Sequence, residues 1–127
     1  MIYTADQKKT MDSILTAFDS AIRGHDFFDI LYCEKFGYVW LHIEPAEGCE
    51  SVAVIKTADQ LLRVLFNEIA DEVRDSSGQE HMSLALTEGE EAETRYRVTE
   101  ILKTMGPDAS FAYPILDDFL KNYANCG

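Results

Sequence analysis

The chain has 127 residues, of which 46% are hydrophobic and 11% aromatic, and its formal net charge is −12. This length and composition predict one compact domain, 1–127, with its own core, and they exclude a disordered chain. No apolar run is long enough to span a bilayer, and the negative charge disfavours nucleic acids and anionic membranes as partners.

We expect a cytoplasmic protein. The N-terminus has no basic stretch followed by an apolar segment, as a secretory signal would. The three cysteines, Cys33, Cys49 and Cys126, form no CxxC pair and have no metal-like spacing. An odd number of cysteines fits a reducing compartment better than a disulfide framework.

The first predicted element is a helix from Ala5 to Arg23. Thr4 and Gln7 have the spacing of a capping box, in which each side chain bonds the backbone of the other residue. Apolar residues then recur at helical spacing. Gly24 is suited to end the helix in a left-handed conformation.

The segment Phe27–Ile43 has the clearest two-residue period in the chain, and a turn signal at Glu34–Gly37 predicts a hairpin. Ser51–Lys56 is expected to add a third antiparallel strand. We place Cys33 opposite Tyr38 or opposite Trp40, and both registers sort the hairpin into the same two faces. The face expected to form the core comprises Phe28, Ile30, Tyr32, Val39, Leu41 and Ile43.

The other predicted face combines aromatic rings, a thiol, an imidazole and carboxylates. Such a row of aromatic side chains with polar tips is typical of binding surfaces. It would equally suit a sheet face covered by a helix. The hypothetical binding face comprises Asp29, Cys33, Tyr38, Trp40, His42 and Glu44.

Three helices are predicted in the rest of the chain. The tetrapeptide of the first capping box recurs at Thr57–Gln60 and begins a helix that ends near Arg74. Thr87–Glu90 is a third capping box, for a helix ended by Gly106 and the proline after it. Pro114 is expected to open the last helix, and His81–Leu86 is either a short strand or an apolar lead-in. The expected fold is therefore α+β, a three-stranded meander with about four helices in the order α-β-β-β-α-(β)-α-α.

Acidic residues are concentrated in the second half of the chain. Between Glu68 and Glu93 there are nine acids and one base, so this segment carries −8 of the net charge. Such a segment can steer a basic protein partner, although a solvated helix face is the commoner explanation. The hypothetical acidic partner surface comprises Glu68, Asp71, Glu72, Asp75, Glu88, Glu90 and Glu91.

No nucleotide-binding, phosphate-binding, zinc-protease or hydrolase motif occurs, so we assign no catalytic residue, metal site or cofactor. We expect a non-enzymatic protein-binding domain acting as a chaperone, inhibitor or adaptor. We also keep open the alternative that two copies of the chain form a homodimer. The alternative is a small-molecule or metal-binding domain, even an enzyme, that uses the hypothetical binding face.

The α-β-β-β-α order resembles that of small acidic secretion-chaperone-like domains. It is also similar to the order of double-stranded-RNA-binding domains, but the charge argues against that function.

Overall fold

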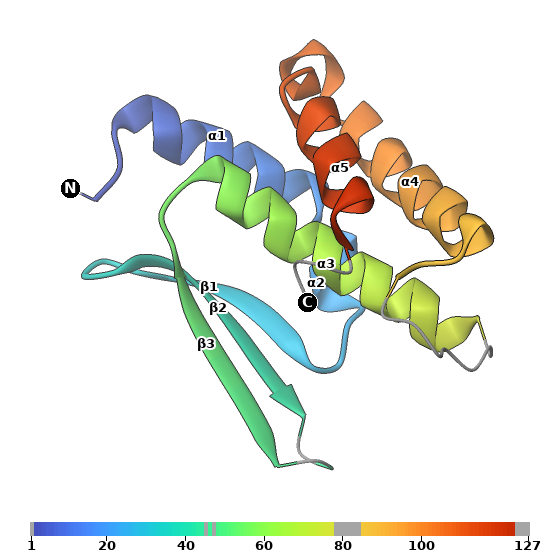
Figure 1. Cartoon of the computed structure of the whole chain (residues 1–127). Coiled ribbons are helices and arrows are strands. Elements are labelled where there is room, and N and C mark those ends of the chain that lie inside the picture. The colour runs from blue at the N-terminus through green and yellow to red at the C-terminus, as the bar shows by residue number, and fades with distance from the viewer. Residues whose placement is uncertain (1, 45, 47, 78–84, 124–127) are drawn as a thin grey trace. The chain divides into compact units, whose positions relative to one another are not determined.

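The computed structural model describes residues 2–44, 46, 48–77 and 85–123. Within these residues, a three-stranded antiparallel sheet and five α-helices confirm the predicted α+β fold and its order (Figure 1). The segment His81–Leu86, for which a short strand or an apolar lead-in was predicted, falls largely on 81–84, which lie outside the described residues. The chain divides into two compact units, Met1–Leu61 and Leu62–Gly127, which are described in turn.

The first unit begins with α1 (Ala5–Ala17) and α2 (Asp19–Arg23). The predicted capping box is confirmed: Thr4 Oγ1 accepts from the Gln7 amide, and Gln7 Oε1 accepts from the Thr4 amide. The prediction of one continuous helix to Arg23 is wrong, because the fully buried Phe18 leaves the helical conformation and separates α1 from α2. Gly24 follows α2, but its φ of −78° is not left-handed.

The sheet consists of β1 (Phe28–Cys33), β2 (Gly37–Glu44) and β3 (Cys49–Ile55), in that spatial order. Both predicted registers of the hairpin are wrong: Cys33 pairs with Gly37, and Ile30 pairs with Trp40. Residues that pair across an antiparallel sheet share a face, so this shift regroups the side chains of β1 relative to those of β2.

Gly37 shows why the hairpin adopts this register. Its φ is +79°, a left-handed conformation that L side chains rarely adopt. It is also crowded, because a Cβ at this position would lie 2.3 Å from the Tyr3 hydroxyl oxygen. That hydroxyl accepts from the Tyr38 amide and donates to the Ile55 carbonyl, so it bonds to β2 and β3 where they pair.

The second unit contains most of α3 (Ala58–Ser76), together with α4 (Glu88–Lys103), the 3-10 helix η1 (Gly106–Ala109) and α5 (Ala112–Lys121). The capping box before α4 is confirmed, and Gly106 has the expected left-handed φ, +69°. Pro114 does not open the last helix, since α5 begins two residues earlier.

Apolar stripes of the three helices form the core of the second unit. The Phe119 ring meets those of Phe66 and Tyr123 edge to face, with ring centroids 5.8 and 5.7 Å apart. All members of the apolar stripe of α3 are buried. They are Leu61, Leu62, Leu65, Phe66, Ile69 and Val73.

Candidate functional site: the outer face of the sheet

The six residues of the hypothetical binding face do not share one side of the sheet. In the observed register, Tyr38, Trp40, His42 and Glu44 lie on the side that carries Phe28, Ile30 and Ile55. Asp29 pairs with Leu41 and Cys33 with Gly37, so both lie on the opposite side. The predicted grouping is therefore wrong, because the turn contains three residues, whereas the two predicted registers require four and six.

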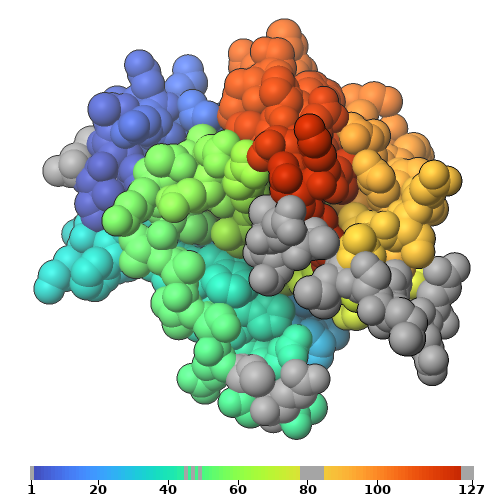
Figure 2. Space-filling view, viewed as in Figure 1, coloured from blue at the N-terminus to red at the C-terminus, as the bar shows by residue number. Residues whose placement is uncertain are grey.

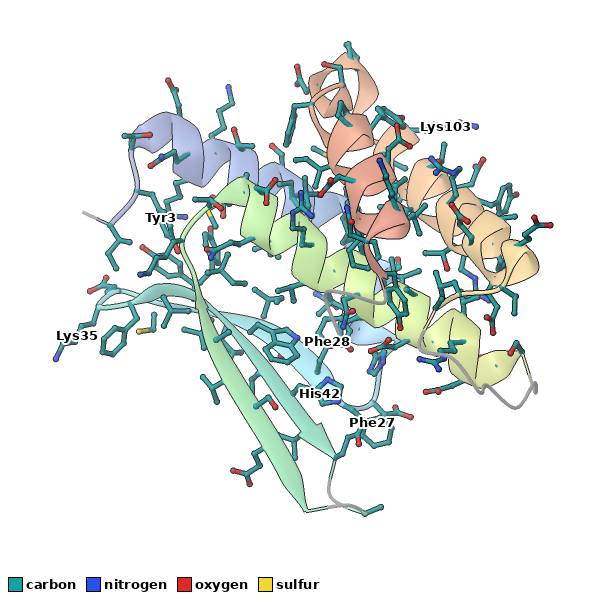
Figure 3. The ribbon with its side chains drawn as sticks, in the orientation of Figure 1. Tyr3, Phe27, Phe28, Lys35, His42 and Lys103 are labelled. Carbon is teal, nitrogen blue, oxygen red and sulfur yellow. The ribbon has the colours of Figure 1, made fainter. Side chains whose placement is uncertain are left out.

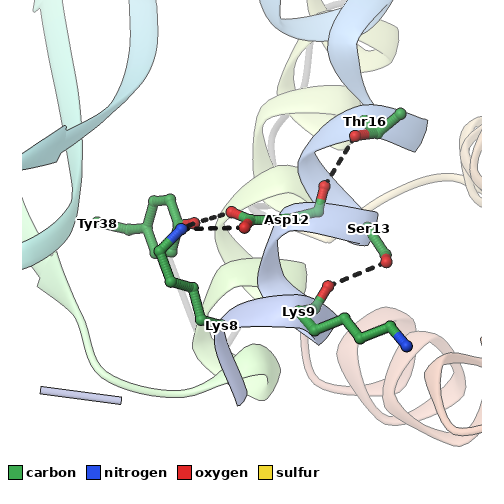
Figure 4. A network of polar contacts seen from close by, with 6 residues as sticks. All are labelled: Lys8, Lys9, Asp12, Ser13, Thr16 and Tyr38. Carbon is green, nitrogen blue, oxygen red and sulfur yellow. Dashed lines mark hydrogen bonds and ion pairs between the residues drawn. The ribbon is translucent and has the colours of Figure 1, made fainter. Parts of the chain in front are cut away.

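The inner face, which carries Tyr38 and Trp40, is occupied near the hairpin turn by α1 (Figure 4). Lys8 Nζ lies 3.0 Å from Asp12 Oδ2 and 3.3 Å from the Tyr38 hydroxyl, which itself donates to Asp12. The same ammonium group lies 4.8 Å from the centroid of the Tyr32 ring. These contacts leave Tyr38 only 3% exposed, so it holds α1 against the sheet.

Tyr3 completes this cluster. Its ring stacks on that of Tyr38, with centroids 5.6 Å apart. Burial raises the pKa of the Tyr3 hydroxyl, and the nearby Tyr32 raises it further. The hydroxyl therefore keeps its proton and remains available as the donor to Ile55.

The opposite end of the inner face carries a second aromatic cluster, shown by Phe28 and His42 in Figure 3. His42 Nε2 lies 3.2 Å from Glu44 Oε1, and the His25 ring packs edge to face on that of Phe28, with centroids 4.7 Å apart. The indole nitrogen of Trp40 is buried without a hydrogen-bond partner among the described residues. Across that part of the chain, no three His, Cys, Asp or Glu residues are grouped so that they could hold a metal ion.

The outer face is aliphatic and open to solvent. Leu31 is 47% exposed, Val52 64%, Val54 42% and Ile43 37%, while Val39 and Leu41 are half-buried. Strand β3 lies at the surface of the first unit in the space-filling view (Figure 2). We call these residues the outer aliphatic face: Leu31, Val39, Leu41, Ile43, Val52 and Val54.

Sequence reasoning missed this surface because it placed Val39, Leu41 and Ile43 in the core. A signal was present in the turn: three-residue hairpin loops commonly have glycine in a left-handed conformation beside them. Gly37 could therefore have indicated pairing with Cys33, which puts Leu31 beside Val39.

The acidic residues of the hypothetical partner surface are largely engaged within the second unit. Glu72 pairs with Arg97 at 3.4 Å, Glu91 pairs with Arg95 at 3.9 Å, and Asp71 accepts from the Tyr123 hydroxyl. Burial, followed by the Asp71 carboxylate, raises the pKa of Tyr123 well above its ordinary value.

Two members of that predicted surface are not at the surface. Glu68 is 3% exposed and Glu90 is 4% exposed. Glu90 is buried because it closes the capping box of α4 through the Thr87 amide. Asp75 and Glu88 are exposed, as predicted.

A shallow hollow of about 240 Å³ lies between the end of α3 and the start of α4. Its polar groups already serve the fold: Arg97 pairs with Glu93 at 2.9 Å, and Thr87 and Glu90 cap α4. We therefore take the outer aliphatic face as the candidate site.

Comparison with protein-family models, with curated proteins and with solved structures found no match to this chain. Among the described residues, no helix combines the length and the apolar character needed to cross a membrane.

Proposed function

We propose that this protein is a non-enzymatic protein-binding domain and that the outer aliphatic face is its binding surface. The observation that carries the proposal is the exposure of Leu31, Val52 and Val54, which lie in adjacent cross-strand rows and are each 42–64% exposed. Large apolar patches on a protein surface are frequently interaction sites, because burying them releases about 25 cal/mol per Å².

The face is also preorganised for binding. Its side chains stand on three hydrogen-bonded strands, so little backbone entropy is lost when a partner binds. Val39, Val52 and Val54 are β-branched and have restricted χ1 angles, which lowers the cost of ordering their side chains.

The alternative of a small-molecule or metal site requires Asp29 and Cys33 to act together with His42. The observed register places the first two on the opposite side of the sheet from His42, so this alternative loses its geometric support. The proposal retains a protein as the partner class.

A photo-crosslinking amino acid tests the proposal. It would replace Val52, which is 64% exposed, and in a control protein Tyr96, which is 62% exposed and lies on α4. We expect protein adducts from position 52 and far fewer from position 96, in cells and at matched expression. Equal labelling at the two positions, or none at position 52, would contradict the proposal.

A further inference from the structure

We infer that the occupant of the outer aliphatic face is a second copy of this chain, packed face to face across a two-fold axis. This inference rests on the proposed function and adds the identity of the partner. It comes from the arrangement of charges around the aliphatic rows.

The two ends of the outer face carry opposite charge on β3. Glu50 pairs with Ile43 at the beginning of the strand. Lys56 directly follows the strand, and alternation from the inward Ile55 places it on the outer side at the other end. Among the described residues, neither Glu50 nor Lys56 forms an ion pair in its side chain, and both are exposed.

A neighbouring residue adds to the negative charge at the Glu50 end of the outer face. Asp29 lies on β1 one row from Glu50, so that end has two outward carboxylates. At the hairpin end, Glu34 and Lys35 in the turn offset each other, which leaves Lys56 as the net charge. Figure 3 shows Lys35 at the hairpin tip and His42 toward the opposite end of the sheet.

Two sheets can pack face to face across a two-fold axis that runs either along the strands or across them. An axis along the strands brings the acidic ends of the two copies together. An axis across the strands reverses one copy, so Glu50 of each copy approaches Lys56 of the other. Like charges at an interface are unfavourable and opposite charges fix its register, so the second arrangement is favoured.

The aliphatic side chains of β2 and β3 also match in the second arrangement. The two central rows are Leu31–Val39–Val54 and Asp29–Leu41–Val52, and the axis lies between them. Val39 then faces Leu41 of the other copy, and Val52 faces Val54, while on the edge strand β1 Leu31 faces Asp29.

The size of the face sets the expected strength. Three strands about 4.8 Å apart, with six to eight residues rising about 3.3 Å each, cover roughly 300–400 Å² per copy. The pair therefore buries roughly 600–800 Å², which is below the about 1,000 Å² of a stable interface and in the range of weak and transient complexes. We therefore expect a weak dimer that exchanges rapidly with the monomer.

Sedimentation velocity over a concentration series tests the inference with charge variants. Lys56→Glu and Glu50→Lys should each weaken the dimer about tenfold, because two-fold symmetry changes each charge pair twice. Mixing the two variants in equal amounts should restore association, as should combining both changes in one chain. Lys9→Glu is the matched control, because this lysine lies on α1 and points away from the Lys8–Asp12–Tyr38 contacts (Figure 4).

The outcomes separate this inference from the proposed function. A purified protein that stays monomeric, a dimer unaffected by Val52→Asp, or a dimer tightened by Lys56→Glu would each overturn the inference. Adducts at position 52 with other proteins but never with a second copy would also overturn it, while the proposed function would stand. If position 52 gives no adduct and the protein is monomeric, both fail.

Discussion

Replacing Gly37 by alanine should destabilise the protein far more than the same change at another left-handed glycine. Two costs add at this position. The φ of +79° costs an L-residue about 1–2 kcal/mol. The new Cβ would also lie 2.3 Å from the Tyr3 hydroxyl oxygen and 2.6 Å from a ring carbon, so the tyrosine must move.

Moving Tyr3 breaks two hydrogen bonds, one from the Tyr38 amide and one to the Ile55 carbonyl. Leaving buried polar groups without partners costs about 1–3 kcal/mol each, so Gly37→Ala should lose about 3–8 kcal/mol in all when the cost of the left-handed φ is included. Gly48 has a φ of +67° and nothing within 4 Å of its Cβ position. Gly48→Ala should therefore lose only the conformational part, about 1–2 kcal/mol.

The assay is urea unfolding of the two variants and the wild type at one pH. A Tyr3→Ala background provides a further check, because without the tyrosine ring Gly37→Ala should cost no more than Gly48→Ala. If Gly37→Ala and Gly48→Ala are equally destabilising in the wild-type background, the close packing of Tyr3 on Gly37 is not what holds the hairpin.

Three further predictions concern stability. Thr87→Ala removes the hydroxyl that accepts from the Glu90 amide and should lower the free energy of unfolding by about 1 kcal/mol in denaturant. Thr99→Ala, inside α4, should be neutral or stabilising. Equal losses in the two variants would contradict the capping role of Thr87. Burial and Asp71 raise the pKa of Tyr123 in the folded protein. The stability that the protonated Tyr123 hydroxyl contributes is therefore complete below about pH 10 and is lost as the pH rises toward the folded-state pKa. The free energy of unfolding should therefore decline above about pH 10, and an unchanged decline in Tyr123→Phe would refute this assignment. Finally, the residues of α3 belong to both units, so the two units should unfold together. Trp40 fluorescence and far-UV circular dichroism should then report one unfolding transition. Two separate midpoints would contradict the predicted single domain.

Local signals in the chain were sufficient for most of the elements. Thr4 with Gln7 and Thr87 with Glu90 form the predicted capping boxes, because both partners lie within one helical turn. The break at Phe18 was not predicted, since the apolar stripe continues through it and no glycine or proline marks it. Nothing in the sequence around Glu68, which is rich in acidic residues, indicated that this side chain would be buried.

The candidate site was the part that sequence reasoning assigned incorrectly. The six-residue binding face depended on whether the turn contains an even or an odd number of residues. A shift of one residue in the pairing moves every side chain of a strand to the opposite face relative to its neighbour. Val52 and Val54 share one face of β3, and the side chains of β2 expected in the core, Val39, Leu41 and Ile43, proved to lie on that same outer face.

The amino-acid sequence alone determined where the helices and strands form, because capping, turn chemistry and hydrophobic period act over a few neighbouring residues. Only the tertiary structure decided which side of the sheet faces solvent. Tyr3, 35 positions before its partner Tyr38 and 52 before Ile55, packs on the glycine of the hairpin and brings α1 to the aromatic side. That long-range contact leaves Leu31, Val52 and Val54 on the outside, where they form the proposed binding surface.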